Sequence, residues 1–385
     1  MRRITGTYHT TTTAGEAVNA FVPHPLPPRS PALHVTGEIE RLHAQALTGL
    51  ARLEVAGRMV PSTNWFLYGF VRKEAVISSQ IEGTQATLRE VVTFEATKQA
   101  KRPHDVEAVC NYVDAINYAR GEVAKPKGLP LSTRLLCESH RRLMKGVRGA
   151  DKAPGEIRRT QNWIGGTRPG NARFIPPPPE QVGKVMSQFE RWLHSDDPLP
   201  PLIKAGLAHV QFETIHPFLD GNGRIGRLLI ALLLEHWELM PSPLLYLSLA
   251  FKRHQSDYYA RLAAVRSNGD WEGWTAFYLR CVREAADDGV NVAGGLFELL
   301  GRDRRRLASN KRATVAAIQL LDVLPDHPVV TTARVAQLLK ITAPTARKAV
   351  DVAVEVGILR EISGKARDRV FAYHKFLQTL TGDES

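Results

Sequence analysis

Twelve residues near the middle of the chain combine side chains that are suited to phosphate chemistry. His216 begins this stretch, Asp220 follows four residues later, and Arg224 and Arg227 close it. Because histidine has an ordinary pKa of about 6.5, His216 is expected to be mostly neutral at pH 7 and able to accept a proton from a hydroxyl. A carboxylate offers hard oxygen to Mg²⁺, and two guanidinium groups three residues apart can bind phosphate oxygens together. These residue types predict an active site that acts on a phosphate ligand.

The flanking sequence indicates how these groups are positioned. Leu202 to Phe212 is apolar enough for a buried helix, and Pro217 disfavours the α conformation at His216, so this helix should end just before the histidine. Arg224 to Leu239 predicts a second apolar helix. Gly221 to Gly223 leads into its first turn, where glycines let the backbone approach a ligand and free amides attract an anion. We therefore expect an anion-binding turn beside His216.

The stretch HPFLDGNGRIGR resembles a known family. It matches the signature HxFx[DE]GNGRxxR of the Fic family (filamentation induced by cyclic AMP) at every specified position. Most members transfer AMP from ATP to a hydroxyl side chain of a protein. The alternative interpretation is a structural helix-loop-helix with a capping asparagine and two surface arginines. The resemblance implies that His216 is the general base, that Asp220 binds Mg²⁺, and that the nucleotide phosphates contact Gly221, Asn222, Gly223, Arg224, Ile225, Gly226 and Arg227.

A second motif lies upstream, at the end of a predicted helix. Gly83 is a plausible helix cap, which places the Glu82 carboxylate at the negative end of the helix dipole, where a cationic partner is expected. Ser78, Glu82 and Gly83 match the inhibitory signature [ST]xxxE[GN] of the Fic family. In members with this motif, the glutamate pairs with the second arginine of the signature, here Arg227, and prevents productive ATP binding. The alternative is an ordinary helix end.

Residues 154–176 alternate in character and carry turn residues, which predicts a β-hairpin. This segment resembles the flap of Fic proteins. An open strand edge can align a target peptide by backbone hydrogen bonding; the alternative is a structural hairpin that only closes the helical core. The flap residues expected to contact the ligand are Ile164, Gly165 and Gly166.

Tyr258 and Tyr259 resemble a tyrosine pair that borders the adenine in Fic relatives, although paired tyrosines on a helix are also common in protein cores. Together with the flap, the pair favours ATP as the donor. Some family members transfer phosphate or phosphocholine instead.

The C-terminal segment has a different order of predicted helices and strands from the rest of the chain. Residues 312–356 predict three helices and residues 358–373 a hairpin, the arrangement of a winged helix. Residues 301–385 contain 15 Lys and Arg against 9 Asp and Glu, and so carry half of the net charge of +12. Duplex DNA is therefore a candidate partner, while protein contacts or a merely basic surface are the alternatives. The residues expected to reach DNA are Thr345, Arg347, Lys348, Lys365, Arg367 and Arg369.

The length of 385 residues predicts two or three domains. The expected fold class is mainly α: an all-helical Fic core with a β-hairpin flap, a helical N-terminal region before it, and a small winged-helix α+β domain after it. Residues 1–33, rich in Thr and Pro, are expected to form an extended arm. The expected domains are 1–100 with the inhibitory motif, 101–300 as the Fic catalytic domain, and 305–385 as the winged helix.

The cysteine spacing and the length of the apolar runs indicate the cellular compartment in which the protein is expected. Cys110, Cys137 and Cys281 are widely spaced and form no CxxC pair, so neither a disulfide framework nor a cysteine zinc site is expected. No apolar run approaches the roughly 20 residues of a membrane span. We expect a cytoplasmic protein without a membrane partner.

Motifs and resemblance together predict a protein adenylyltransferase that uses ATP and Mg²⁺. Its acceptor would be a Ser, Thr or Tyr hydroxyl of a target protein or of the chain itself, with Glu82 inhibiting it and AMP removal as a further activity. A homodimer is compatible with the sequence. The alternatives are a DNA-binding transcriptional regulator whose Fic site senses nucleotide, and a Fic enzyme with another phosphate-containing donor.

Overall fold

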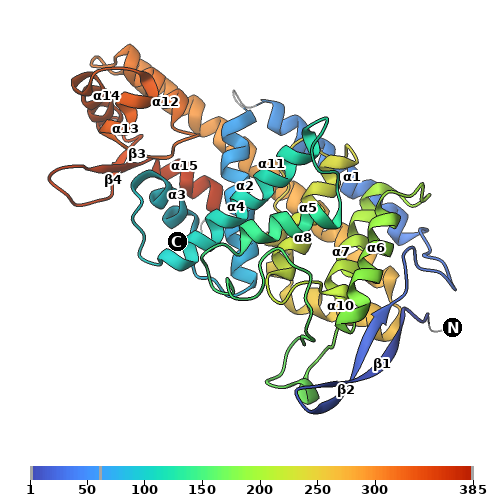
Figure 1. Ribbon diagram of the computed structural model, residues 1–385. Helices are drawn as coiled ribbons and strands as arrows, with labels where there is room; N and C mark the ends of the chain where they lie inside the picture. The colour runs from blue at the N-terminus through green and yellow to red at the C-terminus, as the bar shows by residue number, and fades with distance from the viewer. Residues whose placement is uncertain (1–2, 60–62, 383–385) are drawn as a thin grey trace.

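The computed structural model describes residues 3–59 and 63–382. It is mainly helical, as predicted, and its described residues form one two-stranded and one three-stranded antiparallel sheet (Figure 1). The helices that precede the C-terminal unit are α1 (Glu38–Met59), α2 (Thr63–Ile81), α3 (Leu88–Thr97), α4 (Pro103–Ala124), α5 (Thr133–Leu143), α6 (Pro179–Leu193), α7 (Pro201–Ile215), α8 (Asn222–His236), α9 (Leu247–Arg253), α10 (Gln255–Asn268) and α11 (Trp271–Ser309).

Helices α7 and α8 form the centre of the core. Every residue from Leu202 to Ile215 is buried, which explains why the α7 sequence is apolar on all sides. α7 packs against α8, α6 and α11, while α8 also contacts α2, α4 and α5. The loop between α7 and α8, which carries most of the signature, is therefore supported by rigid elements on several sides.

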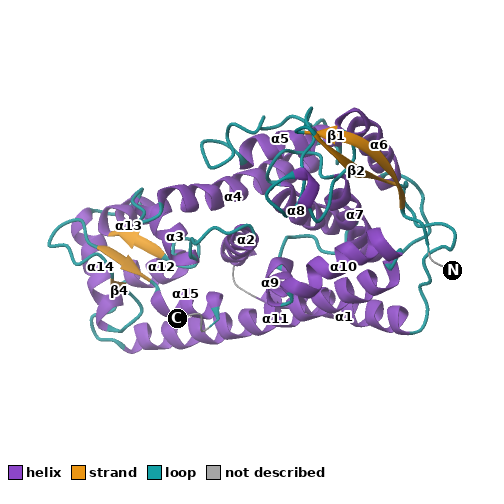
Figure 2. Cartoon of the chain, turned by 90° about the horizontal axis from the view of Figure 1, so that it is seen from below, coloured by secondary structure: helices purple, strands orange, loops and turns teal. Residues whose placement is uncertain are grey.

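Helix α11 differs from the prediction. α11 is one continuous helix of 39 residues, whereas the Fic catalytic domain was expected to end at residue 300 and the winged helix to begin at residue 305. It runs along one side of the molecule, packs against α1, and reaches the C-terminal unit (Figure 2). The predicted domain boundary at residue 305 lies inside this helix.

The N-terminal arm is a β-hairpin, not a single extended segment. β1 (Gly6–Thr13) pairs with β2 (Glu16–Pro23) in antiparallel register around a two-residue turn at residues 14–15. Both turn residues have positive φ, as tight hairpin turns require. The Phe21 N–H donates to the Ile175 carbonyl at 2.9 Å, so the hairpin docks onto the base of the predicted flap.

The C-terminal unit packs onto the rest of the chain, and its buried side chains belong to the same hydrophobic core. Its sheet has the strand order β3-β5-β4. α15 was not predicted, and it packs against α2 and α11. The Tyr373 hydroxyl, just before α15, also donates to the buried Asp303 carboxylate at 2.8 Å. The elements of the unit are α12 (Val315–Val323), β3 (Val329–Thr331), α13 (Thr332–Leu339), α14 (Ala343–Glu355), β4 (Arg360–Glu361), β5 (Val370–Ala372) and α15 (His374–Thr381).

Among the helices in the described part of the chain, none combines the length and the apolar character needed to cross a membrane.

Candidate active site

His216 lies in the turn that ends α7. Its backbone is left-handed, with φ 50° and ψ 59°, and its N–H donates to the Phe212 carbonyl at 2.9 Å. The helix ends where Pro217 predicted. From the flap side, the buried Arg158 donates from Nε to the His216 carbonyl and from its backbone N–H to the Pro217 carbonyl, both at 2.9 Å. These bonds fix the turn in a conformation that is uncommon for a residue other than glycine.

The surroundings of His216 keep it neutral. Burial lowers its pKa to about 4, and the nearby Arg158 charge acts in the same direction. Its Nδ1 lies 3.3 Å from the Glu213 carbonyl oxygen, which can only accept a hydrogen bond. Nδ1 therefore carries the proton, and Nε2 has the lone pair that a general base needs.

The start of α8 has the features expected of an anion site. Gly221 precedes the helix with φ 78°, and the first turn follows from Asn222. The Asn222 side chain faces inward: its Oδ1 accepts from the Phe218 N–H at 2.9 Å and its Nδ2 donates to the Phe218 carbonyl at 2.8 Å. Asn222 thus shapes the loop through its side chain, and the first-turn amides of α8 lie at the positive end of the helix.

His140 on α5 supports the same loop and was not identified from the sequence. Its Nδ1 accepts from the Gly155 N–H at 2.9 Å, so its Nε2 is the donor to the Asp220 carbonyl, also at 2.9 Å. The ring stacks on Phe218 with 3.9 Å between centroids. Burial lowers the pKa of His140 to about 4, which preserves this neutral tautomer. No sequence signal near the motif could have pointed to it, because it lies 80 residues upstream.

Asp220 and Arg224 suit a Mg²⁺–phosphate ligand. The Asp220 side chain is 45% exposed, and its Oδ1 lies 3.9 Å from Nη2 of Arg224. Arg224 is buried, and its Nε has no hydrogen-bond partner among the described residues. The described residues include no cluster of three or more metal-ligating side chains. A single carboxylate fits Mg²⁺, which is commonly bound through one or two carboxylates together with substrate phosphates.

Arg227 pairs with Glu82, although 145 positions separate them in the sequence. Arg227 Nη2 lies 2.7 Å from Glu82 Oε1, and Arg227 also donates to the hydroxyl and the carbonyl of Ser78, both at 2.9 Å. Burial alone raises the pKa of Glu82, but the Arg227 charge and hydrogen bond outweigh it, and the pKa lies below its ordinary value. Ser78, Glu82 and Arg227 are therefore in contact, as the resemblance implied.

The Glu82 carboxylate lies against the anion-binding turn itself. A Cβ added at Gly223 would lie 2.2 Å from Glu82 Oε1 and 3.0 Å from Arg227 Nη1. Gly83 follows with φ 99°. The carboxylate thus lies over the first turn of α8.

The predicted flap is a hairpin closed by one isolated bridge. Ile164 pairs with Phe174, and the Ile164 N–H donates to the Phe174 carbonyl at 2.8 Å. Gly165 and Gly166 follow with φ of 69° and 76° and are exposed. The rest of the segment is irregular and includes a short 3₁₀ turn over Pro169–Asn171.

The two tyrosines of α10 lie in different environments. Tyr258 is buried, and its hydroxyl donates to Nε2 of His209 at 2.8 Å; His209 Nδ1 lies 3.0 Å from the Gly226 carbonyl. Burial lowers the pKa of His209 to about 3, so the histidine stays neutral while it bonds Tyr258 and Gly226. Tyr259 is 47% exposed. Of the pair, Tyr259 presents its ring to solvent, while Tyr258 links α10 to the signature helix through His209.

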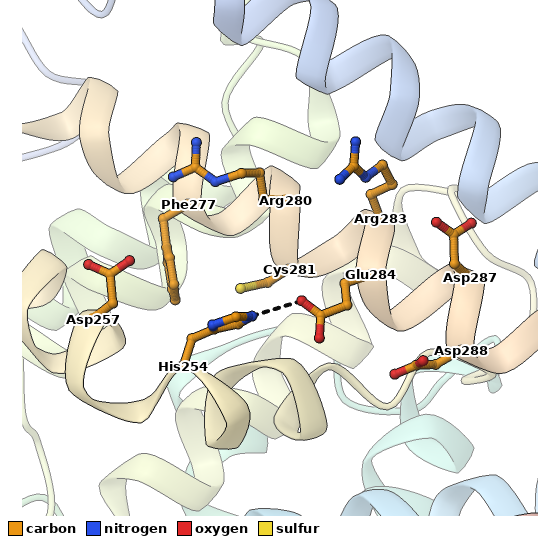
Figure 3. Close-up of a pocket in the computed structure, with 9 residues that line it drawn as sticks. All are labelled: His254, Asp257, Phe277, Arg280, Cys281, Arg283, Glu284, Asp287 and Asp288. Carbon is orange, nitrogen blue, oxygen red and sulfur yellow. Dashed lines mark hydrogen bonds and ion pairs between the residues drawn. The ribbon is translucent and has the colours of Figure 1, made fainter. Parts of the chain in front are cut away.

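A pocket of about 490 Å³ lies between α10 and α11, apart from the signature (Figure 3). Figure 3 shows His254 directed toward Glu284, with Nε2 2.8 Å from the carboxylate. Arg253 also pairs with Glu284 at 2.9 Å, and Arg52 pairs with Asp287. Because these carboxylates are paired with cations or with His254, we assign no ligand to this pocket.

Comparison with known proteins matches one family to the parts of the chain that contain the site. Residues 130–234 match the Fic/DOC family, and residues 40–121 match the Fic/DOC family N-terminal region. The two matched segments, which contain the signature and Glu82, are those of the Fic/DOC family.

Curated relatives with the name protein adenylyltransferase Fic occur in Drosophila erecta and Culex quinquefasciatus. Each is 31% identical to this chain, over 212 and 225 residues. The matches cover 54% and 56% of this chain but 39% and 42% of the relatives, so the chain spans about two fifths of their length.

Solved structures share the fold. A Fic family protein from Desulfovibrio desulfuricans G20 is 21% identical with a TM-score of 0.56, and the match covers 88% of this chain and 97% of that one. Fic-1 from C. elegans is 21% identical with a TM-score of 0.51, and the match covers 68% of this chain and 74% of that one.

Proposed function

We propose that this protein is an adenylyltransferase that transfers AMP from ATP to a Ser, Thr or Tyr hydroxyl of a protein, including its own. The observation that carries this proposal is a neutral, half-buried His216 beside an anion-binding turn that contains two buried arginines. The name shared by the curated relatives supports the same activity.

The groups of the site suit each part of the reaction. The target hydroxyl gives its proton to Nε2 of His216, its oxygen bonds to the α-phosphorus, and the bond from that phosphorus to pyrophosphate breaks. Arg224 and the amides at the start of α8 bind the phosphate oxygens and stabilise the developing charge. Mg²⁺ bound by Asp220 would supply charge neutralisation on the phosphates. The exposed flap edge at Gly165 and Gly166 would align the target segment.

We also propose that Glu82 inhibits this reaction. The carboxylate pairs with Arg227 at 2.7 Å and lies over the turn that would receive a phosphate. Arg227 then cannot bind a phosphate oxygen, and the negative charge of Glu82 repels ATP. ATP is expected to bind weakly or in an unproductive pose until Glu82 moves.

The C-terminal unit supports a second role, as a winged helix that binds duplex DNA. Its order of helices and strands, with a loop between β4 and β5, supports the proposal of a winged helix. Arg347 and Lys348 are exposed near the start of α14, and Lys365 and Arg367 are exposed on the loop. Basic side chains on a recognition helix and a wing are suited to phosphate and base contacts.

The test is mass spectrometry after incubation of the full chain and a cell lysate with Mg²⁺ and ATP labelled on its adenosine part. AMP is expected on a hydroxyl side chain, and the His216→Ala variant serves as the inactive control. A parallel sample with ATP labelled on the γ-phosphate identifies a phosphate transferase. Absence of adenosine label, both from the wild type and from Glu82→Gly, would refute the proposed function.

A further inference from the structure

Glu213 lies one turn before His216 on α7 and has an unusual environment for a carboxylate. Its side chain is 10% exposed, and its Oε1 makes no hydrogen bond to any described residue. Its Oε2 lies 3.9 Å from Nδ1 of His216. A buried acid without hydrogen-bond partners is costly, so its position beside the general base requires an explanation.

The fold leaves space for this carboxylate against α8. A Cβ added at Gly226 would lie 2.4 Å from Glu213 Oε1, so the absence of a side chain there lets the carboxylate approach the helix backbone. Burial raises the pKa of Glu213 to about 7. The charged and titratable groups that face it are His216 on α7, Arg227 on α8, Tyr258 and Arg266 on α10, and Glu82 after α2.

We propose that Glu213 is a positioning residue for His216 in the AMP transfer proposed above. The carboxylate lies on the Nδ1 side of the ring, so it stabilises the orientation in which Nε2 faces the target hydroxyl. When Nε2 takes the hydroxyl proton, the ring becomes an imidazolium, and the Glu213 charge stabilises it across 3.9 Å. The proton leaves to solvent after the product dissociates. This inference rests on the proposed function.

The arrangement has a consequence for pH. His216 is neutral throughout the range above about pH 5, because its pKa lies near 4. Glu213, with its pKa of about 7, is protonated and uncharged below that pH and ionised above it. Only the ionised form stabilises the imidazolium, so the transfer rate should rise with pH through about 7.

The experiment measures initial rates of AMP transfer by the full chain between about pH 6 and pH 8. Glu213→Gln keeps the shape of the side chain and removes its charge. We expect this variant to lose about tenfold or more in kcat at pH 8, the order expected when one of two opposite charges about 4 Å apart is removed, and to lose the rise with pH. Its affinity for ATP should stay within about twofold of the wild type. Glu213→Asp should keep the rise, and Glu298→Gln, at an exposed site on α11, is the matched control.

Two results would overturn the assignment. One is a Glu213→Gln rate equal to the wild type at every pH, and the other is a loss of rate that is uniform with pH and parallel to a loss of ATP affinity. If Glu213→Gln does not fold, a pH-independent rate for Glu213→Asp overturns the proposal instead. Failure of the proposed function is distinguishable, because neither the wild type nor Glu82→Gly would then transfer AMP at any pH.

Discussion

Replacing Glu82 with glycine should raise AMP labelling by at least tenfold. The substitution removes the carboxylate that lies 2.7 Å from Arg227 Nη2 and over the Gly223 backbone. Arg227 remains buried and keeps its two hydrogen bonds to Ser78, so the site's own groups stay in place. The freed guanidinium edge can then bind a phosphate oxygen.

The magnitude follows from the contact that is lost. A hydrogen bond between charged groups contributes about 1.5 to 3 kcal/mol, which corresponds to about one to two decades in an equilibrium. The Glu82 side chain is 37% exposed, so solvent screens part of the interaction and the lower end of the range applies. Removal of the repulsion between the carboxylate and ATP acts in the same direction.

The assay is the initial rate of labelling by adenosine-labelled ATP across a range of ATP concentrations. Glu82→Gln tests the charge without the added backbone freedom of glycine and should give an intermediate gain. Ser78→Ala removes one hydrogen bond that Arg227 donates to an uncharged hydroxyl but leaves the carboxylate, so its gain should stay below about threefold. Arg227→Ala in the Glu82→Gly background should cancel the gain.

Equal labelling rates for the wild type and Glu82→Gly at every ATP concentration would refute the inhibitory role. If Glu82→Gly still raised labelling when combined with Arg227→Ala, the gain would not come from a freed Arg227. In the first case the contact between Glu82 and Arg227 would be structural, and Glu82 would be an ordinary helix end. In the second case Glu82 would inhibit through its own charge and not through Arg227.

His216→Ala should reduce transfer by about 10² to 10⁴ while ATP binding stays nearly intact, since the base acts on the incoming hydroxyl; wild-type labelling by this variant would contradict the base assignment. Asp220→Ala should lose Mg²⁺-dependent ATP affinity as well as rate, and a calorimetric titration that overlays the wild type would contradict its role. Arg347→Ala in the full chain should weaken duplex DNA binding and reduce the slope of log affinity against log salt by about one. Wild-type chain that binds no DNA even at low salt would assign the C-terminal unit to protein contacts.

The sequence determined the chemistry of the signature because that chemistry is local. Pro217 ends α7 at His216, and Gly221 to Gly223 open α8, so one short loop brings the base, the carboxylate and the anion-binding turn together. The apolar runs likewise located α7 and α8 to within a few residues. The pairing of Glu82 with Arg227 joins distant parts of the chain, and it was predictable because both residues belong to motifs of one family.

Tertiary structure decided what depends on packing between distant segments. His140 and Arg158 support the active-site loop from α5 and from the flap, and neither has a local pattern that reveals it. The far part of α11 packs against the C-terminal unit, and the helix ends beyond the domain boundary predicted at residue 305. Burial also sets the protonation states: it lowers the pKa of His216 and raises that of Glu213, two residues whose ordinary values are in the opposite order. Desolvation depends on the atoms that surround a group, and a linear sequence does not specify those atoms.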